Sequence, residues 1–179
     1  MSKDELHNLN FDKLLSDNRQ FAEFLRNFVK KDWVQLLDVE SLELCDEKFI
    51  NQSFGLPENT LLYSAKIAGN GMYFYILLES EVDNTVAFRA LEGMSLIYEK
   101  LFNDTPKEKR ESAEFRLPVI IPIVLYDGKE HWQPSCKLYD FPPNSDLFNG
   151  FINFEYIFVD INALDSDIEI AKFSLYNQQ

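Results

Sequence analysis

The sequence has few of the residues that would place it outside the ordinary globular proteins. Six glycines and seven prolines among 179 residues are too few for a disordered or fibrous chain, and 46% of the residues are hydrophobic. Cys45 and Cys136 stand far apart, without a second cysteine or a histidine at metal-ligand spacing, so we expect buried free thiols and no zinc site. The length suits one well-buried domain over residues 1–179.

Long apolar runs and basic residues are also scarce. No run approaches the roughly 18 to 20 residues needed to cross a bilayer, and residues 1–10 lack the apolar segment of a secretory signal, which predicts a cytoplasmic protein without membrane contact. Thirty acidic residues against 17 basic ones give a net charge of −13. Because nucleic-acid binders gain affinity from basic residues, and the basic stretches 30–31 and 107–110 are short, this balance counts against strong autonomous DNA binding.

Hydrophobic periodicity predicts helices interleaved with strands. Apolar residues recur at helical spacing in 20–29, behind Asp17 as a capping residue, and again in 87–101. Alternating or continuous apolar runs predict strands at 41–44, 60–67, 72–79, 118–126 and 154–161, with a charged loop at 106–114 and a short helix at 166–179. The sequence therefore predicts the α/β class, with a mixed central β-sheet flanked by helices in the order α-β-β-β-α-β.

Two carboxylates follow the strand predicted at 72–79, and they raise the question of a metal site. Asn70-Gly71 is a strong hairpin signal. If these two residues form the turn, Leu62 lies opposite Glu79 and Thr60 lies opposite Glu81. Side chains alternate along a strand, so Glu79 and Glu81 share one side if the strand continues between them. A register error of one residue would reverse every facing assignment.

Two carboxylates at such a short distance repel one another unless a cation or a proton lies between them. Magnesium-dependent phosphodiester cleavage needs hard oxygen ligands of this kind. We therefore expect a magnesium site with Glu79 and Glu81 as ligands, joined by Glu58 if the preceding strand begins early, and with Thr60 at the third catalytic position. The other interpretation of the two glutamates is a solvated strand end that enters a loop.

Four stretches resemble a known family: SDNRQFAEFLRNFVKKDWVQLLDVESLEL, LLYSAKI, YFYILLESE leading to FRALEGM, and LPVIIPIVLYDGKEHW. The sequence is similar to the recombination-promoting nucleases, also called the Rpn or YhgA-like putative transposase family, from about His7 to about Ile161. The last stretch is the most distinctive. The resemblance implies a restriction-endonuclease-like PD-(D/E)XK core and magnesium-dependent DNA cleavage, with a site made of an Asp before Leu-Leu-Tyr and a Glu followed two residues later by Gln.

The sequence departs from that family pattern at several positions. Glu79 matches the family Glu, but Thr60 stands where the Asp belongs and Glu81 stands where the Gln belongs. Near the start, Asn8 and Asp12 replace a family Asp and Lys. The resemblance also implies that the helical C-terminal portion of longer relatives is missing here. The lost ligand and the added negative charge predict a catalytically weak or inactive site.

Other polar residues give weaker signals. Arg89 could contact a phosphate near the site, but a surface salt bridge with Glu92 is the preferred interpretation. Lys129 could also contact a phosphate, but its position in a turn favours the interpretation of a solvent-exposed side chain. His7 and His131 have no partners at the spacing of a catalytic triad or a metal site.

Two functions remain open from the sequence. The first is a magnesium-dependent DNA endonuclease in which Glu79, Glu81 and Glu58 hold the ion. The second is an inactive nuclease-fold protein that acts through protein contacts, pairing with itself or with an active relative. The family resemblance favours the first, whereas the net charge of −13 favours the second and makes DNA a poorly supported partner.

Overall fold

The computed structural model describes residues 15, 17–29, 31–45, 55–56, 60–137 and 154–161. Within these ranges five strands form one sheet whose spatial order follows the chain: β1 (Leu37–Leu44), β2 (Thr60–Ile67), β3 (Asn70–Glu79), β4 (Val119–Tyr126) and β5 (Ile157–Asp160). β1, β2 and β3 pair antiparallel, whereas β4 joins β3 and β5 joins β4 in parallel. The predicted mixed sheet is confirmed.

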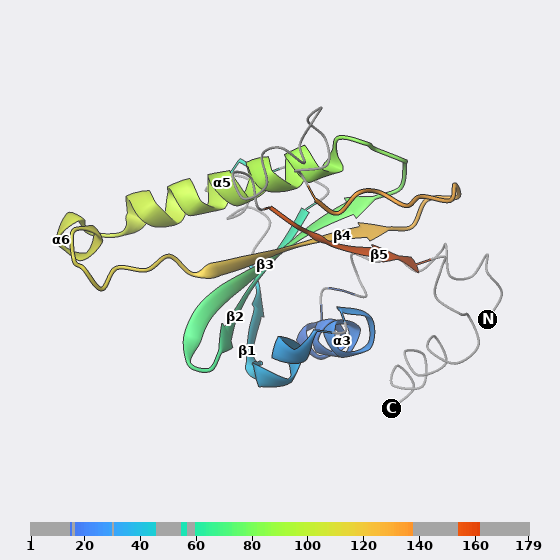
Figure 1. Cartoon of the computed structure of the whole chain (residues 1–179). Helices are drawn as coiled ribbons and strands as arrows, with labels where there is room; N and C mark the ends of the chain where they lie inside the picture. The colour runs from blue at the N-terminus through green and yellow to red at the C-terminus, as the bar shows by residue number, and fades with distance from the viewer. Residues whose placement is uncertain are drawn as a thin grey trace.

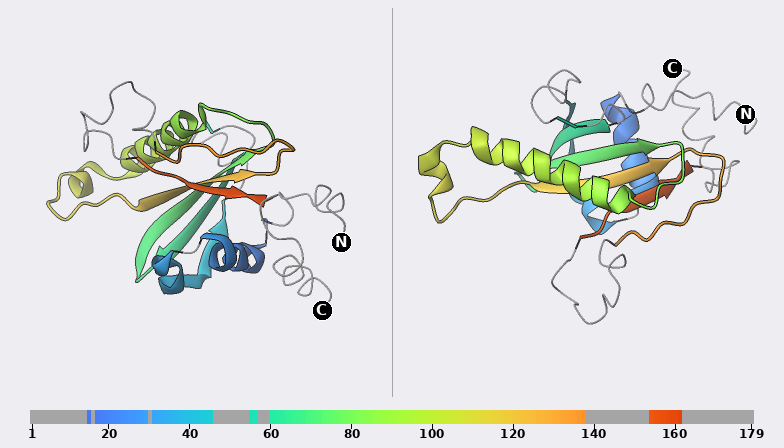
Figure 2. Two further views of the ribbon diagram at one scale, coloured as in Figure 1. Left: turned by 45° about the vertical axis from the view of Figure 1, so that its right-hand side comes forward. Right: turned by 90° about the horizontal axis from the view of Figure 1, so that it is seen from above.

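Helices cover both faces of this sheet. α3 (Asn18–Phe24) continues into a π-helical turn (Leu25–Val29), and a 3₁₀ helix (Asp32–Leu36) leads into β1. α5 (Val86–Asp104) connects β3 to β4 and is followed by the short α6 (Lys107–Arg110). α3 lies against one face of the sheet and α5 against the other (Figures 1 and 2). The predicted α/β class is therefore confirmed, and the arrangement is consistent with a restriction-endonuclease-like core.

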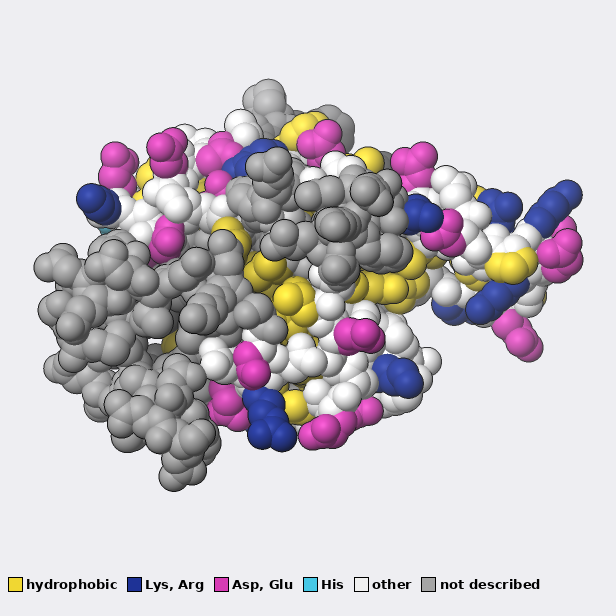
Figure 3. Space-filling model, turned by 180° about the vertical axis from the view of Figure 1, so that it is seen from behind, with side chains coloured by type: hydrophobic (Ala, Val, Ile, Leu, Met, Phe, Trp, Pro, Cys, Tyr) yellow, Lys and Arg dark blue, Asp and Glu magenta, His cyan; other side chains and the backbone are white. Residues whose placement is uncertain are grey.

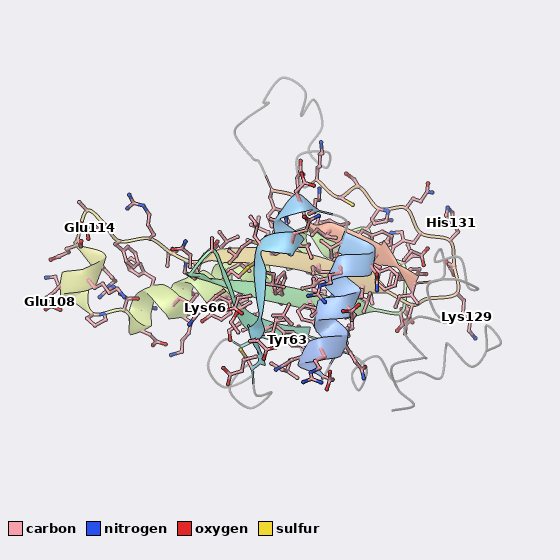
Figure 4. The ribbon with its side chains drawn as sticks, turned by 90° about the horizontal axis from the view of Figure 1, so that it is seen from below. Tyr63, Lys66, Glu108, Glu114, Lys129 and His131 are labelled. Atoms are coloured by element: carbon pink, nitrogen blue, oxygen red, sulfur yellow. The ribbon has the colours of Figure 1, made fainter. Side chains whose placement is uncertain are left out.

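Alternation along β3 divides the apolar residues between two cores. Phe74 faces α3, where the ring of Phe21 stacks on that of Tyr63 with 3.9 Å between ring centroids. Figure 4 shows Tyr63 beside α3. The next residue, Tyr75, faces the other way and packs in the cluster that contains Ala90 of α5. Each face of β3 is therefore buried by a different helix.

Two aspartates fix the starts of the helices. Asp17 caps α3 as predicted, since its Oδ1 accepts hydrogen bonds from the backbone N–H groups of Arg19 at 2.9 Å and Gln20 at 3.0 Å. Ahead of α5, Oδ1 of Asp83 accepts hydrogen bonds from both the backbone N–H and the hydroxyl of Thr85, each at 2.7 Å. The first turn of α5 is thereby anchored to the loop that leaves β3.

The predicted hairpin register is wrong, although the hairpin itself is confirmed. The turn is Ala68-Gly69, and both residues have positive φ values of 47° and 81°, as a tight hairpin turn requires. Asn70 is therefore already in the ladder opposite Ile67, and Thr60 lies opposite Leu77 instead of Glu81. The partner of Thr60 moves by an even number of positions, from Glu81 to Leu77. Because side chains alternate along a strand, Thr60 still lies on the same face of the sheet as Glu79, as predicted.

The second half of α5 extends beyond the sheet and carries an arm, residues 98–118. The buried residues of α5 end at Ile97, and α6 has no buried residue. Arg110 lies over the ring of Phe102, 4.6 Å from its centroid. The region 106–114, predicted as a loop, thus includes the single turn of α6. The arm projects from the body of the molecule (Figure 1) and carries basic and acidic side chains together (Figure 3).

β4 contains a proline, Pro122, which has no backbone N–H to donate to the sheet. Pro122 lies opposite Tyr75 of β3, and the pairing of β4 with β5 begins only at the next residue, Ile123. The first half of β4 is therefore an edge within the described sheet, and an edge is the position where a missing N–H costs least.

Other predictions have mixed outcomes. Cys45 and Cys136 are free thiols, as expected, but both are only partly buried. Among the helices of the described ranges, none is both long and apolar enough to span a bilayer. The predicted helix at 166–179 and the site candidates His7, Asn8, Asp12 and Glu58 lie outside the described residues.

Candidate active site

The carboxyl ends of the three parallel strands meet at one edge of the sheet. Glu79 of β3 lies opposite Tyr126 of β4, which in turn lies opposite Asp160 of β5. Residues paired in this way point to the same face, here the face covered by α5. The backbone N–H of Asp127 donates to the carbonyl of Glu79 at 3.0 Å and extends the contact past the strand ends. Ligand sites of α/β proteins commonly lie at such an edge.

Glu79 is a buried carboxylate at this edge, and the guanidinium of Arg89 pairs with it. The Glu79 side chain is 9% exposed, and its Oε1 lies 2.8 Å from Nη2 of Arg89, whose side chain is 29% exposed. Nε of Arg89 also donates to Oδ2 of Asp83 at 2.8 Å. One cation therefore bridges an acid on β3 and an acid in the following loop.

The ionisation of this group reflects its contacts. Burial opposes the charge of Arg89, but the hydrogen bonds and the negative charges of Glu79 and Asp83 outweigh that effect and raise the pKa of Arg89. Burial likewise opposes the charge of Asp83, yet the hydrogen bonds from Thr85 and Arg89 lower its pKa below the ordinary value. Both groups are thus held in their charged forms.

Two buried hydroxyls lie on the same face as Glu79. Thr60 is 4% exposed, and neither its hydroxyl nor that of Tyr75 has a hydrogen-bond partner within the described residues. Burial is the main cause that raises the pKa of Tyr75 to about 12; the nearby hydroxyl of Thr60 and the charge of Arg89 partly oppose it. Thr60 therefore supplies a neutral oxygen at the position where the family resemblance implies an acid.

Glu81 does not join this group. β3 ends at Glu79, so the strand does not continue to Glu81 as the predicted pairing of the two carboxylates required, and Glu81 is exposed. Glu58 lies outside the described residues. No three histidine, cysteine or acidic side chains come together as possible metal ligands in the part of the chain that the structure describes.

This donor set does not fit a magnesium ion. Magnesium takes hard oxygen ligands in an octahedral arrangement and is usually held through one or two carboxylates. Here the Oε1 atom of Glu79 faces a guanidinium, Thr60 contributes no negative charge, and Glu81 lies beyond the strand end. The described residues therefore form an arginine–carboxylate cluster in place of the expected metal-binding carboxylates.

A tight loop closes the edge beside Glu79. The Tyr126 hydroxyl donates to the carbonyl of Glu130 at 2.9 Å. Gly128 approaches so closely that a Cβ there would overlap the Tyr126 hydroxyl and the carbonyl oxygen of Ser80. Lys129 is exposed, as expected for a turn residue.

The arm, with its basic stretch 107–110, lies far from this loop. Figure 4 places Lys129 and His131 at the opposite end of the molecule from Glu108 and Glu114 of the arm. The 19 residues of α5 separate the two ends by about 28 Å at 1.5 Å per residue. The basic stretch 107–110 therefore does not contribute to the charge at Glu79.

The partner of Arg89 was predicted incorrectly. Arg89 was expected to pair with Glu92 on its own helix, but its salt bridges are to Glu79 and Asp83. A signal for this was present, because a helix that follows a strand in a parallel crossover begins near the carboxyl end of that strand. The described residues therefore place an arginine of the first helical turn next to the last acid of β3.

The fold and this edge define a class of protein: an α/β protein whose order of elements is consistent with a restriction-endonuclease-like core and whose third strand ends in a buried acid, Glu79. The chain belongs to the family described as putative transposase, YhgA-like, whose model matches residues 5–175. The resemblance seen in the sequence is thereby confirmed.

Two curated relatives are similar to nearly the whole chain. Recombination-promoting nuclease RpnC of Escherichia coli K12 is 26% identical over 165 residues, which cover 90% of this chain and 52% of RpnC. Recombination-promoting nuclease RpnD of Escherichia coli O157:H7 is 25% identical over 166 residues, covering 90% of this chain and 60% of RpnD. The chain therefore spans between half and three fifths of the length of these relatives. No solved structure matches it.

Proposed function

We propose that the chain is a recombination-promoting DNA endonuclease of the PD-(D/E)XK type whose active site is degenerate, so that magnesium-dependent DNA cleavage is weak or absent. The nuclease class comes from the family, since the two curated relatives are both named recombination-promoting nucleases. The charge and the partners of the residues at the end of β3 support the degeneracy.

The observation that carries the proposal is that Thr60 and Glu79 lie on the same face of the sheet. The residue expected to be the second acid is a neutral, buried threonine, and the remaining acid is paired with Arg89. Metal-dependent cleavage draws on the charge of its ligands to hold the ion and to lower the pKa of the attacking water. A site with one engaged carboxylate supplies little of that charge.

A cleavage assay tests the proposal. Purified protein is incubated with supercoiled plasmid in Mg²⁺ and in Mn²⁺, beside RpnC at the same concentration. We expect at least a hundredfold less nicking by this chain, because the loss of one catalytic ligand typically costs that much or more. Nicking at the rate of RpnC would disprove the degeneracy.

Restoring the acid makes the test sharper. Thr60→Asp places a carboxylate on the face of Glu79, and Thr60→Asn is the matched variant of nearly equal shape without the charge. We expect Thr60→Asp to bind Mn²⁺ more tightly than Thr60→Asn and to gain nicking activity. Equal metal binding by the two variants would show that position 60 is not part of a metal site.

A second candidate function is protein association, and the exposed apolar side chains of the arm favour it. Phe102 is 41% exposed and Leu117 is 40% exposed, and neighbouring Val119 at the start of β4 is 54% exposed. Apolar side chains gathered on a projecting element are typical of interaction surfaces. Light scattering after size exclusion tests whether the chain pairs with itself or with RpnC. A strict monomer in both experiments would remove this candidate.

A further inference from the structure

The buried carboxylate of Glu79 needs a compensating cation. A carboxylate that is only 9% exposed loses most of its hydration, and such a group is stable in its charged form only when a cation or several hydrogen-bond donors replace the water. In a metal-dependent nuclease the divalent ion plays this part. Here a side chain from α5 is the neighbouring cation.

Two acids, Glu79 and Asp83, hold the guanidinium of Arg89 in place. Its Nη2 lies 2.8 Å from Oε1 of Glu79 and 2.5 Å from Oδ2 of Asp83, and its Nε donates to the same Oδ2 at 2.8 Å. Asp83 is itself fixed by the backbone N–H and the hydroxyl of Thr85, both at 2.7 Å. Through these contacts the guanidinium joins the end of β3 to the start of α5.

A divalent ion and this guanidinium exclude one another at Glu79. Magnesium binds a carboxylate oxygen at about 2.0–2.1 Å. Because Nη2 of Arg89 already faces Oε1 from 2.8 Å, an ion at that oxygen would stand beside a positive charge inside a poorly solvated site. Occupation by a metal thus requires that Arg89 leave both Glu79 and Asp83.

We infer that Arg89 is the resident counter-ion of Glu79: it occupies the cation position at the end of β3, excludes a divalent metal from it, and locks the first turn of α5 onto the sheet. The inference deepens the proposed function and rests on it, since it names the group that keeps the degenerate site free of metal. Metal binding is then opposed in two ways, by the absence of an acid at position 60 and by the positive charge of Arg89.

Manganese binding tests this inference without any measurement of cleavage. The free Mn²⁺ ion is counted by electron paramagnetic resonance during titration of the full chain and of three variants: Arg89→Gln, Arg89→Lys, and Arg89→Gln combined with Glu79→Gln. We expect Arg89→Gln to bind one Mn²⁺ at least tenfold more tightly than the wild type. The gain should vanish in the double variant, which lacks the carboxylate, and in Arg89→Lys, which keeps the positive charge.

The matched control is Arg26→Gln. Arg26 pairs with Glu23 on α3 in a similar salt bridge of 2.6 Å, but that pair is exposed and lies on the opposite face of the sheet. Its replacement should leave Mn²⁺ binding as in the wild type. Equal binding by the wild type and Arg89→Gln would overturn the inference, and so would a gain that survives the loss of Glu79.

Thermal unfolding covers the case in which Arg89→Gln folds poorly. Without its cation, Glu79 is a buried negative charge, so Mn²⁺ should raise the melting temperature of Arg89→Gln and leave that of the wild type unchanged. If the variant unfolds without metal, Mn²⁺ must restore a cooperative transition, and failure to do so contradicts the inference. Plasmid cleavage by the wild type at the rate of RpnC would disprove the proposed function and the exclusion of metal together. Weak cleavage by the wild type combined with equal Mn²⁺ binding by the wild type and Arg89→Gln would overturn the inference about Arg89 and leave the proposed function standing.

Discussion

The guanidinium of Arg89 lies 2.8 Å from the carboxylate of Glu79, although one belongs to α5 and the other ends β3. The contact follows from chain topology. β3, α5 and β4 form a parallel crossover, in which the helix starts beside the carboxyl end of the strand that precedes it. A charged residue in the first turn of such a helix is therefore placed to compensate an acid at the strand end.

The first prediction concerns the stability of this pair. Arg89→Gln should lower the free energy of unfolding by about 1–3 kcal/mol, because it leaves Glu79 buried without its cation; the partial exposure of Arg89 puts the cost below that of a fully buried pair. Glu79→Gln should cost less, since Arg89 keeps Asp83 as a partner. Urea unfolding of both variants checks this order.

The double variant supplies the control for that measurement. If the two side chains interact, Arg89→Gln combined with Glu79→Gln should be more stable than the sum of the single changes indicates. Additive effects would mean that the contact between Glu79 and Arg89 contributes no coupling energy to the folded protein.

The second prediction concerns the contact between α5 and the sheet. Gly93 lies in the middle of α5, where glycine normally costs about 1 kcal/mol relative to alanine. A Cβ at this position would overlap the Tyr75 hydroxyl and ring. We therefore expect Gly93→Ala to lower the stability by about 1–3 kcal/mol in spite of its better helix propensity.

Gly71→Ala is the matched control for this change. A Cβ on Gly71 of β3 would meet nothing within 4 Å, so the same substitution there adds a methyl group in open space. Chemical denaturation should show a stability close to that of the wild type for Gly71→Ala. A Gly93→Ala variant as stable as the wild type would mean that Tyr75 moves aside without cost.

The third prediction is a pH dependence from Asp83. Its pKa in the folded protein lies below the ordinary value of 3.8, because hydrogen bonds from Thr85 and Arg89 outweigh the effect of burial. A lowered pKa stabilises the folded state above pH 3.8, and that contribution is lost as the pH falls through the folded-state pKa. The stability advantage of the wild type over Asp83→Asn should therefore shrink in acid. A difference that stays constant from neutral pH to pH 2 would contradict this assignment.

The elements that position the site were predictable because hydrophobic periodicity depends on local sequence. The limits of β2 agree with the prediction, and the even register shift preserved the face of Thr60. The turn was misplaced because Asn70-Gly71 is the stronger turn signal, whereas the chain turns at Ala68, a residue that rarely adopts a positive φ. Local propensity could not reveal this choice.

The pairing of Arg89 depended on tertiary structure and was therefore missed. Sequence spacing favoured Glu92, three residues further along the same helix, since such neighbours meet on a helix surface. The structure brings in Glu79 and Asp83 instead, because the crossover sets the first turn of α5 over the end of β3. The position of Glu81 likewise depended on where β3 ends, a boundary that pattern analysis locates poorly.

The last prediction concerns the hydroxyl of Thr60. This oxygen is buried and has no hydrogen-bond partner among the described residues, so it contributes a desolvation cost without a compensating contact. Thr60→Val keeps the shape of the side chain and removes the hydroxyl, and it should leave the stability unchanged or raise it by up to about 1 kcal/mol.

Thr60→Ser is the contrasting variant, because it keeps the hydroxyl and removes the methyl group, which should lower the stability by about 1 kcal/mol. Urea unfolding of the three proteins gives the order Val, Thr, Ser. A loss of more than 1 kcal/mol in Thr60→Val would show that the hydroxyl forms a hydrogen bond, with Tyr75 as the nearby candidate. The expected order would instead show that the threonine contributes nothing to stability through its oxygen.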